Sequence, residues 1–175
     1  YCDVVGDLDV GAFHLAWQEV VRRHAVFRTR FVALDSEVPQ QLVLTNAPLF
    51  FAEEDWRGLS EPQQQRALQD YRYADKNAGF DLAKAPLIRV HLLRLTDDRY
   101  HLLWTHHHLL TDGWCTSLIF SEVMQAYASF RQGDNPTLPN VVSYENYLGW
   151  LRKQDPKQAK KFWQKQLKSI SKGTF

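Results

Sequence analysis

Apolar residues recur along this chain at two spacings, and the spacing separates helices from strands. Where they return every third or fourth residue, they mark one face of a helix. Where they alternate with polar residues, they mark a strand. Helices are therefore expected at residues 10–24, 61–78, 115–130, 143–153 and 156–169. Strands are expected at residues 28–34, 41–45, 49–52, 88–93 and 100–105, after a first strand that Tyr1 already enters.

Residues with special backbone preferences stand at the ends of several of these elements. Asp9 is a suitable N-cap for the helix at 10–24, Pro62 stands in the first turn of the next helix, and Gly79 ends that helix. A polar turn at 96–98 joins two alternating segments into a hairpin. Because strands and helices mix without a strict βαβ repeat, the pattern favours a single α/β sandwich.

The composition indicates one globular domain and argues against two classes of partner. The 175 residues are 45% hydrophobic, which is enough for a core. The 21 basic and 20 acidic residues nearly cancel, so we expect binding neither to nucleic acid nor to an anionic membrane. The basic stretch at 157–168 is interpreted as a solvated helix face, with Phe162 and Trp163 buried on the other side.

The cysteines and the apolar runs bear on the cellular compartment. Cys2 and Cys115 have neither CxxC spacing nor the density of a disulfide framework. No apolar run approaches the ~20 residues that a membrane span requires. The sequence therefore suits a reducing cytoplasm.

The stretch with the most chemical content is THHHLLTDGW at residues 105–114. An imidazole at the end of a strand can take a proton from a reacting amine or hydroxyl at physiological pH. Because side chains alternate along a strand, His106 and His108 are expected on one face and His107 on the other. Gly113 is the position least expected to accept a side chain, either because the turn needs a positive φ or because its backbone approaches the substrate.

The pattern His107-His108-x-x-x-Asp112-Gly113 resembles the HHxxxDG motif of the chloramphenicol acetyltransferase superfamily, and most closely that of condensation domains of nonribosomal peptide synthetases. Trp114 continues it as in the DGW of those domains. Other stretches resemble further family motifs in the same order along the chain. They are RHAVFRTRF at residues 23–31, FDL and PLIR within residues 80–89, YENYLGW at residues 144–150 and the aromatic pair at 162–163.

The resemblance implies a chloramphenicol acetyltransferase-like α/β sandwich, with a mixed sheet and flanking helices. Complete condensation domains have two such lobes and a reaction tunnel between them. Residues 1–175 therefore correspond to the N-terminal lobe, without the first family motif and without the entire C-terminal lobe. On its own, this lobe is expected to be inactive.

The implied reaction joins a donor acyl or peptidyl thioester to the amine of an acceptor aminoacyl thioester. Donor and acceptor peptidyl carrier proteins hold the two substrates, so 4′-phosphopantetheine belongs to these partners. The missing lobe and the neighbouring synthetase domains are the other expected partners. No cofactor and no metal are expected on this chain itself.

The resemblance also assigns roles to single residues. His108 contacts the attacking amine, either as a base or by orienting it, and His107 helps to hold the loop. Asp112 supports the site by pairing with Arg28, and truncating either partner of such a buried pair is expected to cost about 3–5 kcal/mol. The competing arginines are Arg23 and Arg30.

Two other functions fit part of the same pattern. An epimerisation domain shares HHxxxDG, although Trp114 agrees better with condensation. An isolated lobe can also serve as a docking or binding module without turnover. Large aromatic residues beside apolar alternation usually pack, so Trp104 and Trp114 are expected in the core rather than as platforms for a substrate.

Two further chemistries use residues of the same stretch. His106, His108 and Asp112 have a spacing that suits zinc ligands, and Cys115 is a possible nucleophile. Neither chemistry accounts for the family-like stretches elsewhere in the chain. The acyl-transfer interpretation accounts for all of them.

Overall fold

The computed structural model describes residues 1–170, which form two compact units. The first unit comprises residues 1–141 and the second begins at Val142. The first unit contains a four-stranded sheet with the order β1-β6-β5-β4. Its strands are β1 (Cys2–Val5), β4 (Phe50–Asp55), β5 (Ile88–Arg94) and β6 (Arg99–His106). Because β4 and β5 are parallel and the other neighbours are antiparallel, the sheet is mixed.

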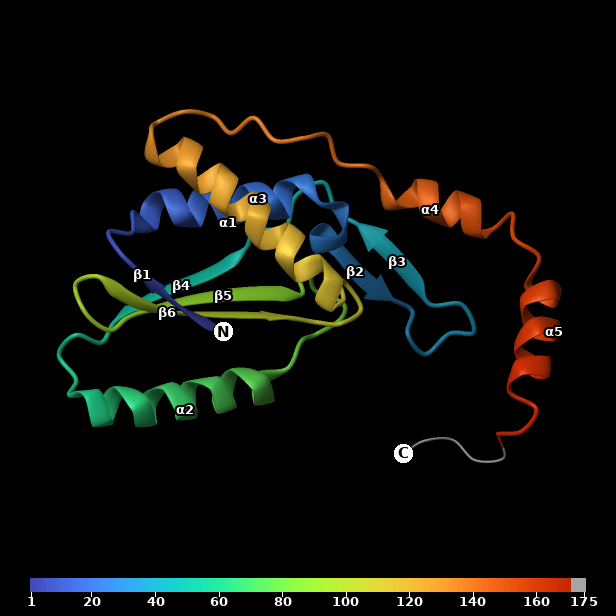
Figure 1. Ribbon diagram of the computed structural model, residues 1–175, viewed down its shortest axis with the longest axis horizontal. Helices are drawn as coiled ribbons and strands as arrows, with labels where there is room; N and C mark the ends of the chain where they lie inside the picture. Colours follow the sequence, from blue (N-terminus) through green and yellow to red (C-terminus); the bar gives the residue numbers. More distant parts are fainter. Residues whose placement is uncertain (171–175) are drawn as a thin grey trace. The chain divides into compact units, whose positions relative to one another are not determined.

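Helices cover both faces of this sheet (Figure 1). Helices α1 (Val10–Arg23) and α3 (Gly113–Arg131) pack together on one face, and α2 (Glu61–Ala78) lies on the other. A short 3₁₀ helix, η1 (Ala25–Arg28), leads from α1 into a two-stranded ribbon. The ribbon pairs β2 (Thr29–Val32) with β3 (Gln40–Val43).

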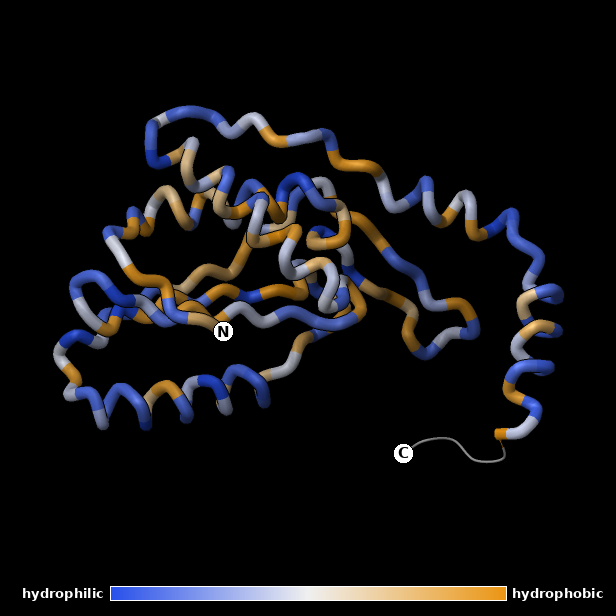
Figure 2. The backbone as a smooth tube through the Cα atoms, viewed as in Figure 1, coloured by the Kyte–Doolittle hydropathy of each residue, from blue (hydrophilic) through white to orange (hydrophobic). Residues whose placement is uncertain are grey.

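Strand β5 shows how side-chain alternation divides the sheet into two faces. Ile88, Val90 and Leu92 are fully buried in the main core with α1 and α3. Leu93 belongs to a second, smaller cluster with Leu68 of α2. The hydropathy colouring in Figure 2 shows that α2 is mostly hydrophilic, in contrast to the apolar stretches of the strands. The sheet therefore has a thick apolar layer under α1 and α3, and a thinner layer under α2.

The local signals at the helix ends act as the sequence predicts. The Asp9 side chain accepts from the Ala12 N–H at 2.9 Å and begins α1. Ser60 and Gln63 form a capping box at the start of α2, and Gly79, with φ of 59°, ends it. The predicted hairpin is confirmed as β5 and β6.

The strand predicted at residues 28–34 is shorter than expected. Residues 25–28 form η1 because Phe27 is buried against the core and the Phe27 N–H donates to the His24 carbonyl. Only Thr29–Val32 pairs as a strand. The ribbon therefore starts one residue after Arg28.

The second unit contains the two predicted C-terminal helices, α4 (Tyr144–Leu151) and α5 (Pro156–Gln166). Ser143 and Asp155 cap their N-termini through side-chain bonds to backbone N–H groups. The predicted burial of Phe162 and Trp163 is wrong, because they are 55% and 56% exposed. No residue of α5 is buried in the part of the chain that the structure describes, so the helical period alone did not identify a packed face.

Candidate active site around the histidine motif

The three histidines lie where β6 ends and the chain turns toward α3. The last strand residue is His106, and the His107 N–H still donates to the Leu87 carbonyl beside β5 at 3.0 Å. The turn is then closed twice: the Leu110 N–H donates to the His107 carbonyl at 3.0 Å, and the Leu109 N–H donates to the His107 Nδ1 at 3.1 Å. Leu110 is buried and anchors the turn.

The imidazoles separate as strand alternation predicts. The His106 ring stacks on Trp104 with centroids 4.5 Å apart, and the His108 ring lies 5.5 Å from it on the same side. The His107 ring instead lies against Phe80, with centroids 6.3 Å apart. His107 and His108 therefore have different neighbours and different environments.

His106 and His108 differ in how far they are buried. Desolvation lowers the pKa of His106, and the charges of His108 and His107 lower it further. An imidazole with a pKa below the usual 6.5 is neutral at neutral pH. His108 is exposed at the rim. Of these two rings, His108 is the more accessible to an incoming substrate.

The histidines border an open pocket of about 490 Å³ between the end of β6 and α2. Phe80 and Leu103 contribute apolar surface to its walls, and Arg72 and Lys76 of α2 contribute two cations. A pocket of this size and lining can hold a small organic group beside the histidines. The predicted site residues His107 and His108 lie on it, whereas Asp112, Gly113 and Arg28 do not.

The predicted ion pair between Asp112 and Arg28 is not formed. Asp112 is exposed and caps α3: its Oδ1 accepts from the Trp114 N–H at 3.0 Å. Arg28 donates to backbone carbonyls instead, to that of Arg22 at 3.2 Å and to that of Leu44. Arg28 lies in η1, within hydrogen-bond distance of the carbonyl that follows β3. Asp112 instead accepts a hydrogen bond from the backbone at the N-terminus of α3.

The competing arginine Arg23 has other partners as well. It pairs with Glu122 of α3 at 3.3 Å and donates to the Pro139 carbonyl at 2.5 Å. Glu122 also contacts the His24 Nε2 at 2.8 Å. The RH pair at residues 23–24 therefore joins the end of α1 to α3 rather than to the histidine turn.

Gly113 begins α3 without a positive φ. A Cβ placed on it meets no atom within 4 Å. The expectation that this turn requires positive φ is therefore wrong. Any need for glycine at this position has to come from what approaches it from outside the described residues 1–170.

Of the two predictions about tryptophan burial, one is confirmed and the other is wrong. Trp104 packs with Trp17 and Phe120 at centroid distances of 5.7 and 5.3 Å, as a core residue should. Trp114 is 87% exposed, so the expectation that it is buried is wrong. As the second residue of α3 it points away from the helix packing surface. Cys115 is a free cysteine whose Sγ lies 3.4 Å from the Asp112 Oδ1.

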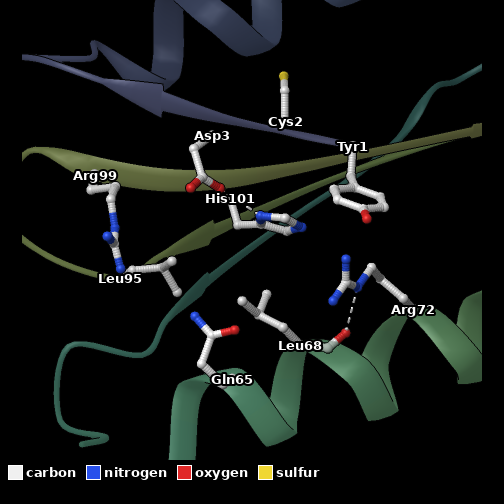
Figure 3. Close-up of a pocket in the computed structure, with 9 residues that line it drawn as sticks. All are labelled: Tyr1, Cys2, Asp3, Gln65, Leu68, Arg72, Leu95, Arg99 and His101. Atoms are coloured by element: carbon white, nitrogen blue, oxygen red, sulfur yellow. Dashed lines mark hydrogen bonds and ion pairs between the residues drawn. The ribbon is translucent and has the colours of Figure 1, made fainter. Parts of the chain in front are cut away.

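A second cavity of about 340 Å³ lies between β1 and α2 (Figure 3). Figure 3 shows His101 and Arg72 facing it from the sheet and from α2, with Tyr1 beside both. The His101 Nδ1 is bonded to Asp3 Oδ1 at 2.7 Å, which ties β6 to β1. Arg72 of α2 and Tyr1, which precedes β1, border both cavities and form the wall that the two share.

Sequence reasoning missed a buried charged group beside the histidines. Asp75 of α2 is 5% exposed at its side chain and bonds to both β5 and β6. A signal was present: Gln64, Leu68, Tyr71 and Asp75 follow one another at helical spacing and form the inner stripe of α2. An acidic residue on the buried stripe of a helix needs partners, which pointed to Asp75.

The described residues hold neither a cluster of metal ligands nor a membrane span. In residues 1–170, no three His, Cys, Asp or Glu side chains converge as a metal site would require. Among the helices in the same residues, none has the length and apolar character needed to cross a membrane.

A comparison with protein families decides the membership of the chain. The family model of the condensation domain matches residues 1–173. The chain belongs to the condensation domain family. It is 39% identical to a linear gramicidin synthase of Brevibacillus parabrevis over 169 residues, which are 97% of this chain and 3% of that protein. It is 38% identical to the chondramide synthase cmdD of Chondromyces crocatus over 171 residues, which are 98% of this chain and 4% of that protein.

Solved structures confirm the sandwich fold expected for a condensation domain. The starter condensation domain of rhizomide synthetase RzmA superposes with a TM-score of 0.80 at 21% identity, over 97% of this chain and 42% of that one. The SgcC5 protein from Streptomyces globisporus gives 0.78 at 25% identity, over 94% of this chain and 38% of that one. The chain thus spans about two fifths of these structures and a few per cent of the synthases.

Proposed function

We propose that this chain is the N-terminal lobe of a condensation domain that forms a peptide bond in a nonribosomal peptide synthetase. The observation that carries the proposal is the arrangement of the HHxxxDG residues: His108 is exposed beside an open pocket, and a doubly closed turn holds it next to the half-buried His106. The family match over residues 1–173 supports it. The reaction then needs a second lobe to complete the tunnel.

His108 is the residue proposed to meet the attacking amine. The amine must lose a proton while it attacks the donor thioester, and an imidazole can accept that proton or orient the amine for attack. His107 has a supporting role because its Nδ1 accepts from the Leu109 N–H. That bond requires an unprotonated Nδ1, so the proton of a neutral His107 sits on Nε2.

The proposed substrates are a donor acyl or peptidyl thioester and an acceptor aminoacyl thioester. Each is attached to 4′-phosphopantetheine on a peptidyl carrier protein, so the prosthetic group arrives with the partner. The thioester already carries the activation needed for amide formation. The free cysteines Cys2 and Cys115 suit a protein that works in the reducing cytoplasm.

The test is intact-mass detection of dipeptidyl product on the acceptor carrier. It uses the two-lobed domain with loaded donor and acceptor carriers, and omits the donor as a control. Product on the acceptor supports condensation. Deuterium exchange at the α-carbon of a loaded carrier, without dipeptide, would assign epimerisation instead, and binding of carriers with neither signal would leave a docking lobe.

A further inference from the structure

A buried carboxylate on α2 joins two strands of the sheet next to the histidine turn. The Thr105 Oγ1 donates to the Asp75 Oδ2 at 2.6 Å, and the Arg89 Nε donates to the Asp75 Oδ1 at 2.8 Å. The His91 Nε2 lies 3.2 Å from the same Oδ1. Asp75 therefore links α2 to β5 and β6 at once.

The charge on Asp75 is maintained by its partners. Burial by itself raises the pKa of this carboxyl, but the hydrogen bonds from Thr105 and Arg89 and the positive charge of Arg89 outweigh burial and leave the pKa lowered. Charge-assisted bonds of this kind are stronger and more directional than neutral ones. The carboxylate can thus hold both strands in a defined geometry.

The first route from Asp75 to the motif runs along β6. Thr105 stands two positions before His107, so the two side chains lie on the same side of the strand. Both border the pocket, as does Asp75. Fixing the Thr105 hydroxyl fixes the end of the strand before the histidines.

The second route runs through Arg89 and Phe80. Besides its bond to the Asp75 carboxylate, Arg89 donates to the Asp75 carbonyl at 2.9 Å and to the Gly79 carbonyl at 2.6 Å. Its guanidinium lies 4.2 Å from the centre of the Phe80 ring, and that ring forms an edge-to-face pair with the His107 ring. Asp75 thereby orients the aromatic surface against which His107 rests.

From these two routes we infer that Asp75 is a positioning residue, which sets the orientation of His107 and, through the turn closed by Leu109, the placement of His108. The inference rests on the proposed function, because its kinetic consequence concerns peptide bond formation. Asp75 touches neither substrate nor reacting atom in this scheme. Its effect is transmitted by the bonds and stacked rings that surround it.

The test replaces Asp75 with asparagine, which keeps the volume and removes the charge. The amide can accept from Thr105 or from Arg89, but its NH₂ group then faces the other donor. Leu68→Ala is the matched control: the Leu68 side chain is buried on the same helix and packs with Leu93 and Leu95, in the smaller apolar cluster. It weakens the docking of α2 and leaves the partners of Asp75 in place.

Both variants are measured in the two-lobed domain by steady-state condensation, with rates normalised to folded protein. Asp75→Asn should lower kcat about 10- to 100-fold, the size of effect that a small misplacement of a reacting group produces, with KM for the loaded carriers changed by less than about threefold. Leu68→Ala should lower the melting temperature and leave the normalised kcat unchanged. Equal normalised kcat values in wild type and Asp75→Asn would overturn the inference.

A spectroscopic measurement tests the positioning role of Asp75 independently of the proposed function. In ¹⁵N-histidine-labelled protein, the His107 Nδ1 should give the signal of an unprotonated acceptor, and Asp75→Asn should shift the His107 resonances while Leu68→Ala leaves them in place. If wild type makes no dipeptide but the His107 shift occurs, the proposed function fails and the positioning role stands. Unchanged His107 resonances in Asp75→Asn would reject the positioning role whatever the activity.

Discussion

Replacing Asp112 with alanine measures what the acidic residue of the histidine motif does in the fold. In the structure its Oδ1 accepts one hydrogen bond, from the Trp114 N–H at 3.0 Å, and contacts the Cys115 thiol. The side chain is exposed, and its interaction with the positive end of the α3 dipole is screened by water. Asp112→Ala therefore removes an N-cap and leaves no buried charge behind.

The expected size of the effect follows from that environment. Loss of an N-cap costs about 1 kcal/mol, within a range of about 0.5–2 kcal/mol. For a chain of this length, 1 kcal/mol corresponds to a fall of roughly 2–4 °C in Tm. A buried ion pair with Arg28 would instead predict a loss of about 3–5 kcal/mol, because Arg28 would be left without its partner.

The assay is urea denaturation followed by circular dichroism for wild type, Asp112→Ala, Arg28→Ala and the double variant. Asp112→Asn serves as the matched control, because its amide oxygen can still cap α3 and should recover most of the loss. Since Arg28 bonds to backbone carbonyls and not to Asp112, the two single effects should add within about 0.5 kcal/mol. A loss above about 3 kcal/mol for Asp112→Ala, together with strong coupling to Arg28→Ala, would mean that the buried ion pair exists and the capping role is wrong.

Three further predictions concern stability and substrate access. Burial lowers the pKa of His91, although the Asp75 charge opposes the shift. Because the unfolded chain then binds this proton more readily than the folded one, the contribution of His91 to stability should be fully present above the unfolded pKa of about 6.5 and should be lost as the pH falls below it. Melting curves between about pH 7.5 and pH 5.5 should show this loss, and His91→Gln should flatten it; an equal slope in the variant would exclude His91 as its source. Gly113→Ala should leave the melting temperature equal or higher, since the site has space for a Cβ and is helical, and a large fall in Tm would contradict this; any defect should appear only in condensation kinetics. Trp114→Ala should change the free energy of unfolding by less than about 0.5 kcal/mol. Ile119→Ala, on the buried face of the same helix, should lower it by about 2–5 kcal/mol, and similar losses for the two variants would show that Trp114 packs in the core.

The elements with strong periodicity and clear caps could be predicted from sequence to within a few residues. Helix α2 is the best case, since Pro62 and Gly79 mark its ends and the structure has it at Glu61–Ala78. The hairpin of β5 and β6 likewise follows from alternation and a polar turn. These features are local, so a short window of sequence contains most of the information that determines them.

Pairings between distant residues were harder to infer. The sequence offered three arginines as partners for Asp112. In the structure, Arg28 bonds to backbone carbonyls and Arg23 pairs with Glu122. Alternation could not separate these candidates, because the choice depends on where η1 brings Arg28 relative to β3. The exposure of Trp114 was missed for the same reason: apolar character does not say which face of α3 meets the sheet.

The hydrogen-bond network around Asp75 could be predicted only in part from the sequence. Its position on the inner stripe of α2 could be read from helical spacing, and Arg89 was already part of a recognised stretch. What the sequence did not contain was the register that places Thr105 opposite Arg89 on neighbouring strands. That register turns three ordinary polar residues into one buried junction beside the histidines.

Whether His108 meets the attacking amine is decided by the single-turnover rate of dipeptide formation in the two-lobed domain. His108→Ala is compared with wild type and with His14→Ala, a histidine of α1 that stacks on Phe51 away from the motif. We predict a loss of about 100-fold or more for His108→Ala, the size expected for a group that handles a proton or orients the nucleophile, and a rate near wild type for His14→Ala. A folded His108→Ala protein that forms dipeptide at the wild-type rate would show that the amine does not depend on this imidazole.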